Sequence, residues 1–169
     1  MDPPDQHRAY GPDRLGFATL TVSDSRSEAD DTSGDEVERL TTAAGHRLVE
    51  RRIVPDEIVE IRAAAGELLR RDDVDVLVLS GGTGFSPRDL TLEAAAPLLE
   101  RRIDGFGELF RMLSFEEVGA AAMLSRAAAG IIGGRAVFVL PGSPKAVALA
   151  MERLILPEAG HLLGQARRS

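Results

Sequence analysis

The chain contains no cysteine and no tryptophan, and aromatic residues make up only 4% of it. Without cysteine there is no disulfide framework, no thiolate metal site and no cysteine nucleophile. The shortage of aromatic rings also argues against the stacking platforms that bind unpaired bases. Three histidines remain as soft metal ligands, His7, His46 and His161, and no spacing groups them into a metal site.

Positive charge is also scarce. The 27 Asp and Glu residues outnumber the 20 Lys and Arg residues, which gives a net charge of −7. A protein that follows a nucleic-acid backbone usually carries the opposite sign, so we expect no nucleic-acid partner. The same negative field repels phosphorylated ligands. Such a ligand must therefore be held by local features, such as a glycine loop, a helix N-terminus or a bound cation.

Long apolar runs are missing as well. No stretch approaches the roughly 18 apolar residues of a membrane-spanning helix, so we expect no membrane association. The first residues lack the apolar segment of a secretory signal, and we expect a cytoplasmic protein. Residues 1–14 are rich in proline and polar groups and predict a flexible N-terminal arm. The rest of the 169 residues is long enough for one core, and we expect a single domain at residues 15–165.

Strand and helix patterns alternate along this domain. Strands are predicted at residues 16–22, 46–54, 74–79 and 136–140, and helices at residues 33–44, 55–69, 91–101, 106–128 and from Pro144 onward. Residues 74–79 are almost all apolar, which is typical of a strand that is covered on both faces. The alternation predicts an α/β sandwich with a mainly parallel sheet, whose ligand sites lie beyond the carboxyl ends of the strands.

The strongest candidate loop follows the apolar strand and reads SGGTGFSPRD at residues 80–89. Its glycines allow close backbone approach, so successive N–H groups can form a nest for phosphate, and Asp89 could hold a cation that offsets phosphate charge. Alternatively, the glycines turn the chain and Asp89 or Thr91 caps the next helix. The pattern alone leaves these two readings about evenly matched. Neither a P-loop nor a dinucleotide fingerprint is present.

Other polar turns follow the remaining strands. Ser143 is a predicted helix cap with Pro144 behind it, and an exposed helix N-terminus attracts anions. Residues 21–33 carry small hydroxyl and carboxyl groups that are also ordinary turn and cap residues. Ser33 and Glu36 fit a capping box. Asp56, between Pro55 and Glu57, is first of all a candidate helix cap.

One predicted helix is too apolar for a single buried face. The residues concerned are Phe106, Phe110, Met112, Leu113 and Phe115. Part of this segment should therefore meet a neighbouring subunit. The two glycines at its start, Gly105 and Gly107, are compatible with a hinge or a lid.

Seven motifs, in order, resemble the MoaB/Mog family of molybdenum-cofactor biosynthesis proteins. They are TVSDSR at 21–26, DTSG at 31–34, SGGTG at 80–84, RD at 88–89, GFGE at 105–108, LSRA at 124–127 and PGS at 141–143. The resemblance covers residues 16–158, and the sequence at residues 105–111 and 141–143 is more similar to the MoaB branch. It implies a three-layer α/β/α molybdopterin-binding fold of the MogA kind and a homotrimer or a dimer of trimers.

The same resemblance implies Mg²⁺-dependent adenylyl transfer from ATP to molybdopterin, with release of pyrophosphate. Carried over by motif, the catalytic and Mg²⁺-binding residues are Asp56 and Asp89. The residues implied in binding molybdopterin and nucleotide are Ser23, Asp24, Ser80, Gly81, Gly82, Thr83, Gly84, Arg88, Glu108, Ser125, Pro141, Gly142 and Ser143. Two alternatives stay open: a non-catalytic molybdopterin-binding protein with the same pocket, and a different nucleotide-binding α/β protein.

Overall fold

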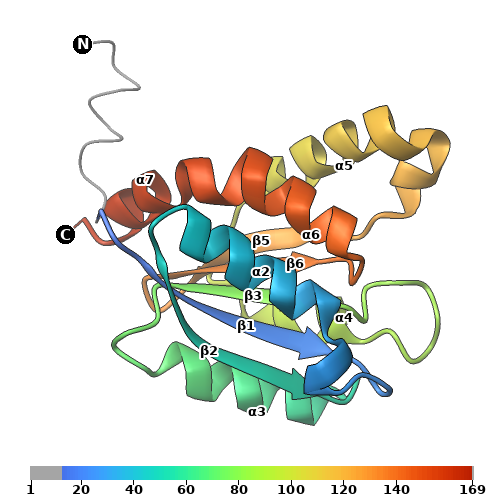
Figure 1. The fold of residues 1–169 in the computed structure, drawn as a ribbon, viewed down its shortest axis with the longest axis horizontal. Coiled ribbons are helices and arrows are strands. Elements are labelled where there is room, and N and C mark those ends of the chain that lie inside the picture. Colours follow the sequence, from blue (N-terminus) through green and yellow to red (C-terminus); the bar gives the residue numbers. More distant parts are fainter. Residues whose placement is uncertain (1–12, 169) are drawn as a thin grey trace.

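The computed structural model describes residues 13–168 and contains one six-stranded sheet (Figure 1). In spatial order the strands are β2 (Arg47–Val54), β1 (Gly16–Val22), β3 (Val76–Ser80), β6 (Arg135–Leu140), β5 (Ala128–Ile132) and β4 (Arg101–Arg102). The first four run parallel, whereas β5 and β4 pair antiparallel at one edge. The expected mainly parallel sheet is therefore confirmed.

Helices cover both faces of the sheet, which confirms the α/β/α sandwich (Figure 1). One face carries α2 (Thr32–Ala43), α5 (Asp104–Val118), α6 (Pro144–Ala150) and α7 (Leu156–Ala166), and the other carries α3 (Ile58–Leu69) and α4 (Thr91–Ala95). Short helical segments are η1 (Glu28–Asp30), η2 (Ala96–Leu98), η3 (Gly119–Leu124) and η4 (Met151–Ile155), which joins α6 to α7. No helix within residues 13–168 is long and apolar enough to cross a membrane.

The central strand β3 shows why the sheet has two cores. Val76 and Val78 pack against the face with α2 and α5, while Leu77 and Leu79 pack against the face with α3. All four side chains are fully buried. Burial of such a side chain stabilises the fold by about 1.5–3 kcal/mol, so an apolar run without polar alternation is what this position requires.

Two helix predictions extended too far. The predicted helix at 106–128 ends at Val118, because Gly119 has a φ of 63° that a continuing helix does not allow, and residues 128–132 form β5 instead. Gly130 in β5 lies so close to β4 that a Cβ there would be 2.4 Å from the carbonyl oxygen of Arg101. The predicted helix at 91–101 shortens to α4, since the chain turns at η2 and enters β4.

Two capping predictions were wrong and one was confirmed. Helix α2 is capped by Asp31, whose side chain accepts a hydrogen bond from the N–H of Gly34, and not by Ser33. Asp56 does not cap α3, because its carboxylate bonds a residue far along the chain. Ser143 does cap α6, accepting a 3.1 Å hydrogen bond from the N–H of Ala146. The predicted N-terminal arm lies outside the described residues except for positions 13 and 14.

Candidate functional site

The carboxyl ends of the parallel strands meet at an open pocket of about 550 Å³. Residues 22–26 at the end of β1 line it, together with the Gly81–Gly82 turn after β3 and the turn at 142–144 after β6. Asp56, which follows β2, and Arg88 and Asp89 complete the lining. The pocket therefore lies at the sheet edge where the strand order predicts a ligand site.

Most residues in the predicted set reach this pocket. Those that line it are Ser23, Asp24, Asp56, Gly81, Gly82, Arg88, Asp89, Gly142 and Ser143. Ser80, Thr83 and Pro141 adjoin lining residues in the chain, and Gly84 follows Thr83, but none of these four lines the pocket. Glu108 is exposed on α5 and Ser125 follows η3, and neither lines the pocket.

The glycine turn allows the loops to approach closely. Gly81 and Gly82 have φ angles of 91° and 61°, a region that side chains rarely adopt. A Cβ on Gly82 would lie 2.3 Å from both Oδ2 of Asp56 and Oγ1 of Thr91. The Thr91 hydroxyl is buried and has no hydrogen-bond partner in the described structure. Glycine at position 82 thus keeps a carboxylate oxygen and a buried hydroxyl beside the turn.

Asp56 is the most enclosed acid of the pocket, with an exposed fraction of 5%. Its Oδ1 accepts a 2.9 Å hydrogen bond from the backbone N–H of Leu90. Burial raises the pKa of Asp56 above its ordinary value, and the negative charges of Asp89 and Asp24 add to that increase. A cation beside Asp56 would relieve this repulsion.

Asp24 and Arg88 form an ion pair across the pocket mouth. The Arg88 Nη2 lies 2.7 Å from Oδ2 of Asp24, whose Oδ1 accepts a hydrogen bond from the N–H of Asp56. The hydrogen bond from Arg88 lowers the pKa of Asp24, so this carboxyl is ionised at neutral pH. Asp24 thereby connects the loops after β1, β2 and β3.

Asp89 closes a short turn at the end of the glycine loop. Its Oδ2 accepts a 2.9 Å hydrogen bond from the N–H of Ser86, and its own N–H donates to the carbonyl of Ser86. Asp89 is therefore not the cap of α4, which begins after Leu90 with no side-chain cap. Within residues 13–168, no group of three or more acidic, histidine or cysteine side chains forms a ready metal site.

Two carboxylate oxygens of the pocket are nevertheless of the kind that binds Mg²⁺. Oδ2 of Asp56 and Oδ1 of Asp89 accept no hydrogen bond from the described residues, so each acid keeps one oxygen for a cation. Mg²⁺ commonly takes one or two carboxylates and completes its shell with water and substrate phosphate. Asp56 and Asp89 are the residues that would hold it.

Local sequence reasoning missed the contacts that hold the turn after β6. The Ser33 hydroxyl donates a 2.5 Å hydrogen bond to the carbonyl of Gly142, and Arg26 reaches both Ser33 and that carbonyl. Ser33 and Gly142 are 109 positions apart. Ser33 lies in the DTSG motif at 31–34 and Gly142 in the PGS motif at 141–143, and no local spacing pairs them.

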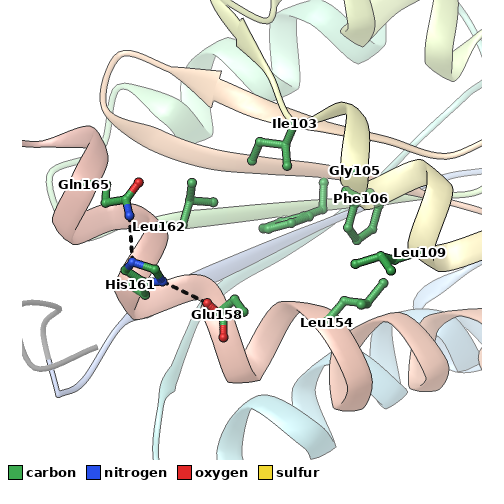
Figure 2. A pocket seen from close by; sticks show the side chains of 10 residues that line it. Ile103, Gly105, Phe106, Leu109, Leu154, Glu158, His161, Leu162 and Gln165 are labelled. Atoms are coloured by element: carbon green, nitrogen blue, oxygen red, sulfur yellow. Dashed lines mark hydrogen bonds and ion pairs between the residues drawn. The ribbon is translucent and has the colours of Figure 1, made fainter. Parts of the chain in front are cut away.

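A second hollow, of about 330 Å³, lies between α5 and α7 (Figure 2). Phe106, Leu109 and Leu154 supply apolar walls, and His161 forms hydrogen bonds to Glu158 and Gln165 on one side. None of the residues that line the polar pocket lines this hollow. Its lining is mostly apolar and does not suit a phosphate group.

Comparison with known proteins shows the family and the fold. Residues 18–161 match a family model described as a probable molybdopterin binding domain. Molybdenum cofactor biosynthesis protein B of Bacillus cereus is 44% identical over 164 residues, which cover 96% of this chain and 97% of that protein. A solved structure of a molybdenum cofactor biosynthesis protein B is 45% identical, with a TM-score of 0.90 over 94% of this chain and 99% of that one. The tungsten cofactor synthesizing protein MoaB from Pyrococcus furiosus is 40% identical, with a TM-score of 0.85 and coverage of 93% and 99%.

Proposed function

The chain belongs to the MoaB family of molybdenum cofactor biosynthesis proteins, and from this premise we propose that it transfers the adenylyl group of ATP to molybdopterin in the cytoplasm. A terminal phosphate oxygen of molybdopterin attacks the α-phosphorus of ATP. The new P–O bond forms as the bond to the β-phosphate oxygen breaks, so pyrophosphate leaves and adenylylated molybdopterin remains. No protein nucleophile takes part, and catalysis comes from positioning and charge stabilisation.

The observation that carries this proposal is the meeting of a glycine turn with two aspartates at one pocket. The N–H of Gly82 donates to no other described residue and is offered to phosphate, and Asp56 and Asp89 line the same pocket. In a chain of net charge −7, acids next to a phosphate nest make electrostatic sense when a cation lies between them. Bound there, Mg²⁺ would neutralise phosphate charge as it develops on the leaving pyrophosphate.

The remaining side chains shape the pocket. Arg88 brings a positive charge to the pocket lining, and Asp24 holds its guanidinium in place. Arg26 and Ser33 hold the carbonyl of Gly142, so the turn after β6 keeps a constant shape. These contacts support a preformed site for two phosphorylated substrates.

We also propose that the protein is a homotrimer or a dimer of trimers. Phe106, Phe110 and Leu113 of the apolar helix are buried in its own core. An apolar face remains exposed on α5 and η3, formed by Leu109, Met112, Phe115, Val118, Met123 and Leu124. Clustered apolar exposure of this kind marks a protein interface, and a second copy of the chain is its proposed partner.

The decisive experiment incubates the purified protein with molybdopterin, ATP and Mg²⁺ and measures pyrophosphate and adenylylated molybdopterin. We expect both products in equal amounts. Molybdopterin binding without pyrophosphate release would identify a non-catalytic pterin-binding protein. Absence of pterin affinity would favour a different nucleotide-binding protein.

A further inference from the structure

The middle of the glycine loop is held by an arginine from a distant part of the chain. Nε of Arg126 donates a 2.8 Å hydrogen bond to the carbonyl of Thr83, and Nη2 donates a 2.7 Å hydrogen bond to the carbonyl of Gly84. Arg126 lies between η3 and β5, 43 residues beyond Thr83. One planar guanidinium thus binds two successive peptide carbonyls.

The ends of the loop have other supports. The N–H of Gly81 donates to the carbonyl of Leu140, and the N–H of Thr91 donates to the carbonyl of Gly82. Asp89 and Ser86 close the turn before α4. None of these hydrogen bonds involves the peptide groups that follow Thr83 and Gly84. The orientation of those two peptide groups therefore depends on Arg126.

Arg126 is itself immobilised. Its Nη1 lies 2.7 Å from a carboxylate oxygen of Glu93 on α4, and its guanidinium lies over the ring of Phe85, 5.2 Å from the centroid. The hydrogen bond from Arg126 lowers the pKa of Glu93, so this partner is ionised at neutral pH. All three guanidinium nitrogens are therefore engaged in a fork that lysine cannot reproduce.

This fork determines where two backbone donors point. In a trans peptide the C=O and the following N–H point in opposite directions, and the described residues contain no cis peptide. Because the carbonyls of Thr83 and Gly84 point toward Arg126, the N–H groups of Gly84 and Phe85 point away from it. Within residues 13–168, neither N–H has a hydrogen-bond partner, and both residues lie in the exposed stretch of the loop between the pocket-lining residues Gly82 and Arg88.

We infer that Arg126 is a positioning residue that orients the N–H groups of Gly84 and Phe85 to bind a phosphate oxygen of the substrate. The inference rests on the proposed function for the identity of the substrate. Arg126 does not touch the substrate, and it acts through the loop backbone. It extends the phosphate nest to Phe85, a residue that the motif comparison did not assign.

The test compares two arginines that each donate hydrogen bonds to two successive backbone carbonyls. Arg62 donates to the carbonyls of Glu93 and Ala94, in α4 rather than in the loop. We compare Arg126→Lys and Arg62→Lys with the unaltered protein. Calorimetry measures the affinity for magnesium pyrophosphate, and thermal unfolding verifies that each variant is folded. Chymotrypsin cleavage after Phe85, whose exposed fraction is 68%, reports the order of the loop without any ligand.

We expect Arg126→Lys to weaken pyrophosphate binding about tenfold or more and to speed cleavage after Phe85, because one ammonium replaces a two-carbonyl fork. Arg62→Lys should leave both measurements unchanged. Glu93→Gln, which weakens the ion pair with Arg126, should also weaken pyrophosphate binding and speed cleavage after Phe85, by smaller amounts than Arg126→Lys. If folded Arg126→Lys binds pyrophosphate as tightly as the unaltered protein, the inference is wrong.

The same measurements separate this inference from the proposed function. If the unaltered protein binds pyrophosphate and Arg126→Lys does not, but no adenylylated molybdopterin forms, the function is wrong and the positioning role stands. If adenylyl transfer occurs and is equally fast in Arg126→Lys with unchanged pyrophosphate affinity, the function stands and the positioning role is wrong.

Discussion

The backbone N–H of Leu90 lies 2.9 Å from Oδ1 of Asp56, a residue 34 positions earlier in the chain. This hydrogen bond joins the loop after β2 to the end of the glycine loop. It also directs one oxygen of Asp56 toward the protein, while Oδ2 lies beside the Gly82 turn. An asparagine at position 56 could keep the first contact but not the charge, which makes the substitution informative.

We predict that Asp56→Asn alters the pH dependence of stability. Burial raises the folded-state pKa of Asp56 above its ordinary value of 3.8, so the folded protein binds more protons than the unfolded chain between these two values. Stability of the unaltered protein therefore falls as pH rises through this window, and asparagine removes that loss. Thermal unfolding from about pH 3 to about pH 7 should show Asp56→Asn gaining stability relative to the unaltered protein as pH rises. Parallel curves would contradict the prediction.

We predict that Asp89→Asn lowers turnover much more than molybdopterin affinity. Asparagine can still accept the hydrogen bond from Ser86, so the turn should persist. Loss of a charge that holds Mg²⁺ on the transferring phosphate should cost on the order of a hundredfold in rate. Pyrophosphate release at saturating Mg²⁺ measures the effect, with Asp104→Asn, an exposed acid at the start of α5, as the control. Near-normal release by folded Asp89→Asn would remove Asp89 from the metal site.

We predict opposite effects of alanine at two glycines. Gly82→Ala places a Cβ 2.3 Å from Asp56 and Thr91 at a φ of 61°, so it should destabilise the protein by about 1–3 kcal/mol and reduce turnover. Gly105→Ala meets no atom within 4 Å in the first turn of α5 and should stabilise it by about 0.5 kcal/mol. Denaturant unfolding measures both changes. Equal stabilities for the two variants would show that the Gly82 turn is not sterically constrained.

We predict that Phe115→Lys disrupts assembly. Its side chain is 61% exposed and belongs to the apolar face on α5 and η3, where a charge would be buried against a second copy. Light scattering should report a smaller particle than for the unaltered protein. Val59→Lys is the control, since Val59 is 75% exposed but lies on α3, outside that face. An unaltered protein that is already monomeric at micromolar concentration would remove the proposal.

Local sequence patterns were sufficient to predict those helices and strands whose surroundings are uniform along their length. Residues 74–79 predict a strand covered on both faces, and β3 occupies that place in the centre of the sheet. By contrast, β5 begins with small residues that suit a helix equally well. Its strand conformation depends on hydrogen bonds to β6 and on the close approach of β4 to Gly130, which no local pattern contains.

The candidate site was likewise predictable from local sequence only in part. Residue types and motif order predicted which loops carry polar groups, because glycine turns and helix caps are local features, as at Ser143. The sequence alone, however, made Asp56 and Ser33 caps of their own helices. Their actual partners, Leu90 and Gly142, lie 34 and 109 positions away. Only the strand order β2-β1-β3-β6 brings these residues together, because hydrogen bonds between loops depend on which strands are neighbours in space.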